Sequence, residues 1–171
     1  MSGRGFIDGL DFARHGRELQ GEFAAAAFER LQDCLYDDSG VLAYRLQGGS
    51  NDRQQPVIDI AVRGALHLRC QRCLGAYDFS VDVQRRLVLV TRAGELPDPA
   101  EEEEQVDTVL AEPQMEIAAL IEDEILLCLP ISPRHDDAAC VAPRPTGDDA
   151  ARVDSPFAAL TQLQRRNPAR R

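Results

Sequence analysis

The feature that most constrains the fold is a run of alternating apolar and polar residues over residues 58–90, interrupted by one tight turn. Before the turn, apolar side chains occupy even positions, at Ile58, Ile60, Val62, Leu66 and Leu68. After the turn, they occupy odd positions, at Tyr77, Phe79, Val81 and Val83. A period of two residues is typical of a β-strand with one buried face. The pattern therefore predicts a long β-hairpin that organises the rest of the chain.

The alternation also predicts the register of this hairpin, because apolar residues of one face must lie opposite one another. The predicted pairs are Leu66 with Phe79 and Leu68 with Tyr77 on the inside, and His67 with Asp78 and Arg63 with Asp82 on the outside. The outer arginines then have an ordinary structural use as cross-strand ion pairs. The alternation slips at Arg85 and Arg86, which predicts a β-bulge before Leu87.

The remaining chain indicates an α+β fold. Further strands are expected at residues 5–16, 41–46 and 106–110, and helices in the latter half of residues 19–36 and over residues 115–129. This order favours one domain over residues 1–130, with an antiparallel sheet that can curl toward a barrel and two main helices packed on it. An acidic loop is expected at about 94–105. Residues 131–171 are expected to form an irregular tail with a short amphipathic helix at about 156–166.

Composition excludes several classes of function. All 19 basic residues are arginine, which excludes Schiff-base chemistry and a lysine-bearing phosphate loop. The net charge of −10 is unevenly distributed. Residues 1–95 hold 12 arginines against 13 acids, whereas residues 96–164 hold 3 arginines against 16 acids. The acidity therefore lies in the second half of the chain.

The chemical state expected for the five cysteines depends on the cellular compartment, which the sequence indicates. No charged leader with an apolar run is present, and nowhere do 18 uncharged apolar residues follow one another. We therefore expect a cytoplasmic protein that does not insert into a membrane. In that compartment an odd number of cysteines favours reduced thiols or metal ligands over a disulfide framework.

Cys70 and Cys73 form a C-x-x-C pair at the predicted hairpin tip, and three interpretations stay open. A zinc knuckle supplies half of a tetrahedral site, and His135 and Cys140 are the best candidates for the other half. Closing a loop of about 60 residues costs roughly 4 kcal/mol, against about 10 to 16 kcal/mol from structural zinc. A thiol-redox pair is the second interpretation, with Arg69 and Arg72 lowering a thiol pKa. The third is a pair of reduced cysteines that only pack the turn.

The sequence offers no catalytic residues. Glu122, Asp123 and Glu124 occupy consecutive helix positions that diverge by about 100° each, so they cannot converge on one ion unaided. They are expected to form a solvated face or to bind arginine. The three histidines are scattered, with no nucleophile context around them.

Three motifs together resemble the bacterial YceD family, the large ribosomal RNA subunit accumulation proteins. They are LRCQRCL at residues 68–74, IEDEILLCLPISPRHDDAAC at residues 121–140 and SPFAALTQL at residues 155–163. The resemblance implies a role in the synthesis, processing or stability of large-subunit ribosomal RNA, and it implies no enzymatic activity. The alternative is a small thiol-redox or zinc-dependent protein that uses the C-x-x-C turn.

Two kinds of partner fit this role. Direct binding to a large-subunit rRNA precursor requires clustered cations, because neutralisation of phosphates dominates affinity for RNA. The candidates are the arginines on and beside the hairpin, Arg63, Arg69, Arg72, Arg85 and Arg86. Alternatively, the acidic second half could hold a basic ribosomal protein.

Overall fold

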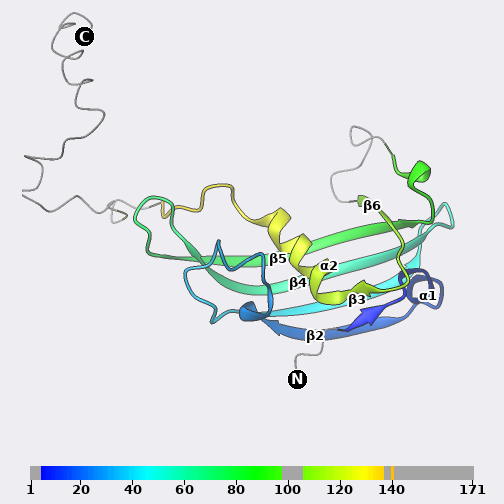
Figure 1. Ribbon diagram of the computed structural model, residues 1–171, viewed down its shortest axis with the longest axis horizontal. Coiled ribbons are helices and arrows are strands. Elements are labelled where there is room, and N and C mark those ends of the chain that lie inside the picture. The colour runs from blue at the N-terminus through cyan, green and yellow to red at the C-terminus, as the bar shows by residue number, and fades with distance from the viewer. Residues whose placement is uncertain (1–4, 98–105, 137–139, 141–171) are drawn as a thin grey trace, which may run out of the picture. The chain divides into compact units, whose positions relative to one another are not determined.

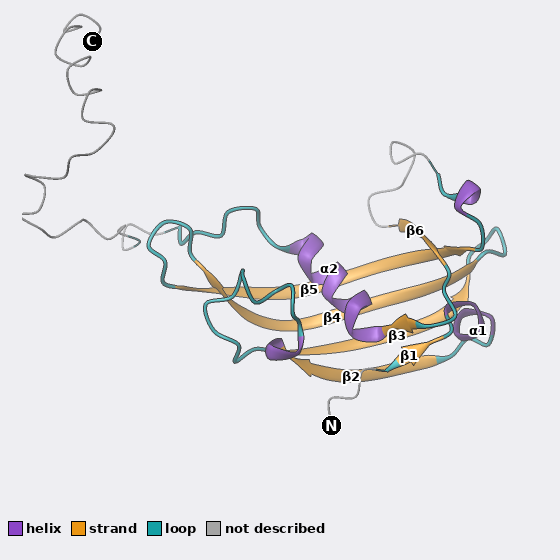
Figure 2. Ribbon diagram, viewed as in Figure 1, coloured by secondary structure: helices purple, strands orange, loops and turns teal. Residues whose placement is uncertain are grey.

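The structure is a computed structural model that describes residues 5–97, 106–136 and 140 of the chain (Figures 1 and 2). In chain order the elements are β1 (Phe6–Ile7), α1 (Gly9–Arg14), β2 (Glu18–Ala24), the 3₁₀ turn η1 (Ala25–Ala27), β3 (Val41–Ser50), β4 (Pro56–Arg69), β5 (Ala76–Val90), the 3₁₀ turn η2 (Ala93–Glu95), β6 (Val106–Leu110), β7 (Met115–Glu116) and α2 (Ile117–Cys128). Within these residues, no helix combines the length and apolar character needed to span a bilayer.

A five-stranded sheet with the order β2-β3-β4-β5-β6 forms the body of the fold. Its neighbouring strands are antiparallel except β5 and β6, which run parallel. Among the described strands, β2 and β6 each have one neighbour in this sheet and do not pair with each other, so the sheet is open. The two short strands β1 and β7 pair separately. The α+β class is confirmed, whereas the closure toward a barrel is not.

The central hairpin of β4 and β5 has the predicted register. Leu66 lies opposite Phe79, and His67 lies opposite Asp78. The side chains of Leu66 and Leu68 are fully buried, while the residues between and beside them alternate to the other face. Burial of one face therefore fixes the pairing, since a slip of one residue would expose the whole apolar set.

The predicted bulge at Arg85 and Arg86 is wrong. Pairing continues without interruption from Asp59 opposite Arg86 to Ile60 opposite Arg85. Arg85 keeps its place on the inner face of the sheet because its guanidinium reaches the buried carboxylate of Glu124 on α2, at 3.8 Å. The apparent slip in the alternation was therefore a charged side chain at a core position.

The core lies between the inner face of the sheet and the two helices, and Figure 1 shows α2 lying across β4 and β5. α2 contributes Ile117, Ile121 and Ile125, all buried. α1 approaches β3 so closely that a Cβ on Gly48 would collide with the backbone of Phe12. Glycine at position 48 is therefore a requirement of helix packing rather than of backbone conformation.

The helix predicted in the latter half of residues 19–36 is wrong. Residues 18–24 form β2, whose inward side chains are Leu19 and Phe23, and residues 29–34 form turns. The backbone N–H groups of Arg30 and Leu31 donate to Oε1 of Glu122 on α2, at 2.7 and 3.2 Å. A distant carboxylate therefore replaces the carbonyl acceptors that a helix would supply.

Of the other predicted helices and strands, some agree with the structure and others do not. Residues 106–110 form a strand as expected, and α2 occupies most of the predicted helix over 115–129. The predicted strand at 5–16 is reduced to β1, which precedes α1 with Asp8 as its N-cap. Most of the acidic loop at 94–105 and the amphipathic helix at 156–166 lie outside the described residues.

Candidate metal centre

The first half of the site is the turn that joins β4 to β5. Backbone hydrogen bonds from Leu74 N–H to the Cys70 carbonyl and from Cys70 N–H to the Gly75 carbonyl, both 2.9 Å, close it. Leu74 has a positive φ of 61°, which turns the chain sharply after Cys73. The Cys70 Sγ also accepts the backbone N–H of Arg72 at 3.5 Å. This geometry points both thiols to one side, as a metal-binding knuckle requires.

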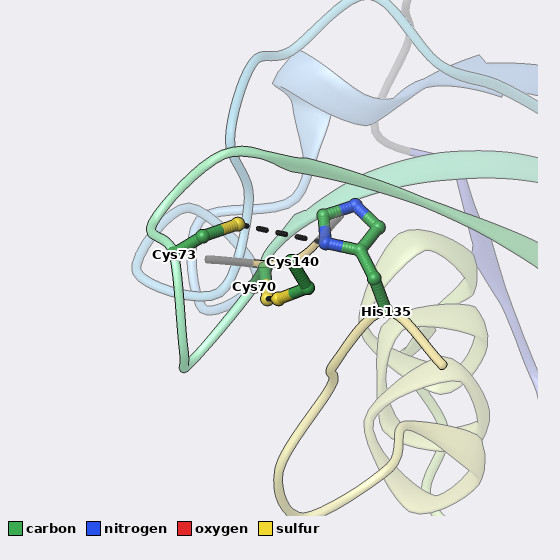
Figure 3. Close-up of side chains that lie close together, drawn as sticks. All are labelled: Cys70, Cys73, His135 and Cys140. Carbon is green, nitrogen blue, oxygen red and sulfur yellow. Dashed lines mark hydrogen bonds between the residues drawn. The ribbon is translucent and has the colours of Figure 1, made fainter. Parts of the chain in front are cut away.

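The second half comes from the segment that follows α2. The backbone N–H of Gln71 donates to the carbonyl of Pro133 at 2.8 Å, which joins this segment to the hairpin tip. Figure 3 shows His135 facing Cys73 and Cys140 beside Cys70. The Cys70 and Cys140 sulfurs are 3.5 Å apart, and the Cys73 Sγ lies 3.5 Å from Nδ1 of His135. The structure therefore brings together the four residues that the sequence suggested as ligands.

His135 is oriented for coordination through Nδ1. Its Nε2 lies 2.7 Å from the carbonyl oxygen of Ala76, which can only accept, so Nε2 carries the hydrogen. This contact, above all, raises the pKa of the imidazole. In the neutral ring, Nδ1 then directs a lone pair toward Cys73. Histidines that bind metals usually donate their other ring N–H to a carbonyl or carboxylate in this way.

The buried thiols have opposite tendencies to ionise. Burial disfavours the Cys70 thiolate, but hydrogen bonds from backbone N–H groups, that of Cys73 foremost, together lower the pKa of Cys70 to about 5. Burial and the neighbouring Cys70 sulfur raise the pKa of Cys140 to about 11. Of the two thiols, Cys70 therefore ionises more readily to the thiolate anion. Such an anion is the form of cysteine that binds metals.

The dimensions of the cluster fit a tetrahedral ion. An ion that binds sulfur at about 2.3 Å separates neighbouring sulfurs by about 3.8 Å. All four ligand atoms lie within 4.8 Å of one another, so small shifts of the side chains would bring them onto one ion. Cys70 and Cys140 are buried, and Cys73 and His135 are partly exposed. The four residues could therefore hold a metal in a largely enclosed site.

The five arginines suggested as contacts for RNA or a partner do not form one group. Arg63 and Arg86 lie on the outer face of the sheet and pair with carboxylates on the neighbouring strand, Asp82 at 3.0 Å and Asp59 at 2.7 Å. Arg85 lies on the inner face beside α2. The other two, Arg69 and Arg72, flank Cys70 at the hairpin tip and are exposed. Their role in binding stays a prediction.

One residue of the site region was missed by the sequence reasoning. Arg134 stands directly before His135 and is exposed at the same end of the molecule. The sequence could have predicted the position of Arg134. A residue adjacent to a predicted ligand must lie near the hairpin tip when that ligand does. Glu122 and Glu124 are buried rather than solvated, and both bind arginine, which confirms the alternative interpretation of this acidic run.

Comparison with known families gives one match. The model of a family described as "Large ribosomal RNA subunit accumulation protein YceD" matches residues 58–164. This range covers more than half of the chain and includes the central hairpin, α2 and all four residues of the cluster. No solved structure matches the chain. The match confirms the resemblance found in the sequence motifs.

Proposed function

Because this chain belongs to the YceD family of large ribosomal RNA subunit accumulation proteins, we propose that it supports the synthesis, processing or stability of large-subunit ribosomal RNA. It does so in the cytoplasm as a binding factor, without catalysis. The observation that carries this proposal is the family match over residues 58–164. The description of that family names an accumulation role and no reaction.

We further propose that the cluster of Cys70, Cys73, His135 and Cys140 holds zinc. Three thiolates and one imidazole form a soft ligand set that suits zinc and disfavours magnesium or calcium. All four ligand positions are filled by protein, which is typical of structural rather than catalytic zinc. Zinc would thus fasten the segment after α2 to the hairpin tip.

The burial of Cys70 argues against the thiol-redox alternative. Exchange with a substrate disulfide requires an accessible thiolate. Within the C-x-x-C pair, Cys73 is partly exposed, but Cys70, the thiol whose pKa is lowered, is fully buried. The low pKa of Cys70 therefore suits a ligand better than a nucleophile. A structural metal centre explains both its ionisation and its enclosure.

The partner is a large-subunit rRNA precursor or a basic ribosomal protein. Exposed arginines at the hairpin tip favour RNA, whereas the excess of acids over residues 96–164 favours a basic protein. Either partner places the chain on particles that are precursors of the large subunit.

Fractionation of cell extracts tests the proposed function. We expect the tagged chain to sediment with large-subunit precursors, and its depletion to lower large-subunit rRNA relative to small-subunit rRNA. A chain found only in the free fraction, with unchanged rRNA levels on depletion, would overturn the proposal. The same measurement on a Cys70→Ser variant shows whether the metal centre is needed.

A further inference from the structure

The end of the molecule that carries the metal centre also carries three exposed arginines. Arg69 and Arg72 flank Cys70, and Arg134 precedes His135. We refer to Arg69, Arg72 and Arg134 as the arginine tip. Each arginine is adjacent in sequence to a proposed ligand or within two residues of one, so the fold of the metal centre determines where all three lie.

The arginine tip differs in pairing from the arginines of the sheet. Arg45, Arg63 and Arg86 on the sheet each form an ion pair with a carboxylate at 3.0 Å or less. Within the described residues, no member of the arginine tip forms an ion pair with a carboxylate. Residues 68–77 hold two arginines and no acid, and Asp136 is the acid next to the second part of the tip. Apart from one donor of Arg69, which lies 3.5 Å from the carbonyl oxygen of Leu35, these guanidinium groups therefore keep their donors available within the described residues.

Other unpaired arginines of the described chain have acids close in sequence. They are Arg14, Arg53 and Arg92, which lie within three residues of Asp11, Asp52 and Glu95, respectively. Arg134 likewise has Asp136 two residues away, so what distinguishes the arginine tip within the described residues is that its unpaired arginines come from two separate segments of the chain.

Leu74 adds an apolar group to the same tip. Its side chain is 58% exposed although its backbone has a positive φ of 61°, a conformation that glycine adopts at lower cost. Because the Leu74 side chain is exposed to solvent, it does not stabilise this fold by burial. Strained, exposed positions of this kind occur where a ligand is bound.

We propose that the arginine tip binds the phosphate backbone of RNA, with Leu74 packing against a base or sugar. This inference rests on the proposed function and identifies the RNA contact within it. The sign of the charge decides the class of partner, because a basic ribosomal protein would be repelled. Guanidinium groups match phosphate oxygens with paired donors, which makes phosphate the fitting ligand.

Formation of the metal centre assembles the complete tip. Arg134 reaches the hairpin through the contacts of its own segment, among them the hydrogen bond from Gln71 to Pro133, the hydrogen bond from His135 to Ala76 and the approach of His135 to Cys73. Loss of the metal would remove one of the links that hold Arg134 near Arg72. RNA affinity is therefore coupled to metal binding.

Measurement of RNA binding by the zinc-loaded full chain, at several salt concentrations, tests this inference. The probe is a transcript of large-subunit rRNA. Each of Arg69→Gln, Arg72→Gln and Arg134→Gln should weaken binding roughly four- to sixfold at 0.15 M salt and reduce the salt slope by about 0.7 to 0.9. The matched control Arg45→Gln removes an exposed arginine that pairs with Glu18, and it should change affinity less than about twofold.

A Leu74→Gly variant separates a binding role from a structural one. It should leave the melting temperature unchanged or higher, because glycine tolerates positive φ, while it weakens RNA binding about fivefold. Removal of the metal with a chelator should weaken binding as much as Arg134→Gln does.

Three results would overturn the inference and leave the proposed function standing. The first is RNA binding that responds equally to the tip variants and to Arg45→Gln. The second is no binding to the transcript by a chain that still sediments with large-subunit precursors, which would point to a protein partner. Equal competition by polyglutamate and by RNA would show a general anion site and would also contradict it.

Discussion

The Nε2 atom of His135 lies 2.7 Å from the carbonyl oxygen of Ala76, the first residue of β5. This hydrogen bond fixes the tautomer and turns Nδ1 toward Cys73. The end of one strand thereby orients a ligand that comes from a segment 59 residues away. The proposed metal centre is therefore built on the hairpin, with the later segment docked onto it.

Replacement of His135 tests this orientation. His135→Ala removes one of four ligands, and we expect zinc affinity to fall by more than about 100-fold. His135→Cys supplies a thiolate in place of the imidazole and should retain tight binding. Competition with a metal indicator measures both affinities. Equal affinity of His135→Ala and the unmodified chain would show that His135 is not a ligand.

Glu122 stabilises the turns before β3. Its carboxylate accepts the backbone N–H groups of Arg30 and Leu31 and the Nε–H of Arg30. Glu122→Ala leaves two backbone donors without this acceptor, and we expect a loss of about 2 to 4 kcal/mol in the free energy of unfolding. Asp123→Ala removes only an exposed contact to Arg30 and should cost less than about 1 kcal/mol. Urea denaturation measures both, and equal losses would contradict this account.

Glu124 makes stability depend on pH. Burial, aided by the charge of Asp107 and Asp123 and opposed by Arg85, raises the pKa of Glu124 to about 7. Its carboxyl thus holds a proton more tightly when folded than when unfolded, where the pKa is about 4.5. Stability should therefore fall as pH rises through this window.

The variant Glu124→Gln should remove that pH dependence. We expect it to gain on the order of 1 to 3 kcal/mol over the unmodified chain at about pH 8 and little at about pH 4. Glu112→Gln, at an exposed position, is the matched control and should leave the profile unchanged. Urea denaturation across this range measures the effect, and parallel profiles for Glu124→Gln and the unmodified chain would refute it.

Gly48 and Gly49 make a matched pair of adjacent substitutions. An alanine Cβ at position 48 would meet the backbone of Phe12 and Ala13, whereas at position 49 its nearest neighbour is Val57 at an ordinary 3.8 Å. We expect Gly48→Ala to destabilise the fold by about 1 to 3 kcal/mol, because α1 must move, and Gly49→Ala to be nearly neutral. Thermal unfolding of both variants provides the comparison. Similar melting temperatures would show that α1 does not require this close approach.

The sequence predicted the parts of the fold whose signal is local. Strict alternation around Leu66 and Phe79 was enough to give the hairpin register, because a slip would expose the core. The cluster of Cys70, Cys73, His135 and Cys140 was also predictable, since the sequence places a histidine and a cysteine close together at residues 135–140. The predictions that were wrong concerned residues whose structure depends on contacts with residues distant in sequence. Contacts with Glu122 override the helix propensity of residues 19–36. Arg85 interrupts the alternation of apolar residues and was therefore interpreted as a bulge, although the strand pairing is continuous.

The central claim is that two distant pairs of residues form one zinc site. Metal analysis of the freshly purified full chain, compared with Cys140→Ser, tests it most directly. We predict about one zinc ion per chain, a strong reduction in the variant, and a lower melting temperature after chelation. Negligible zinc in the unmodified chain, or the same content in Cys140→Ser, would contradict the claim.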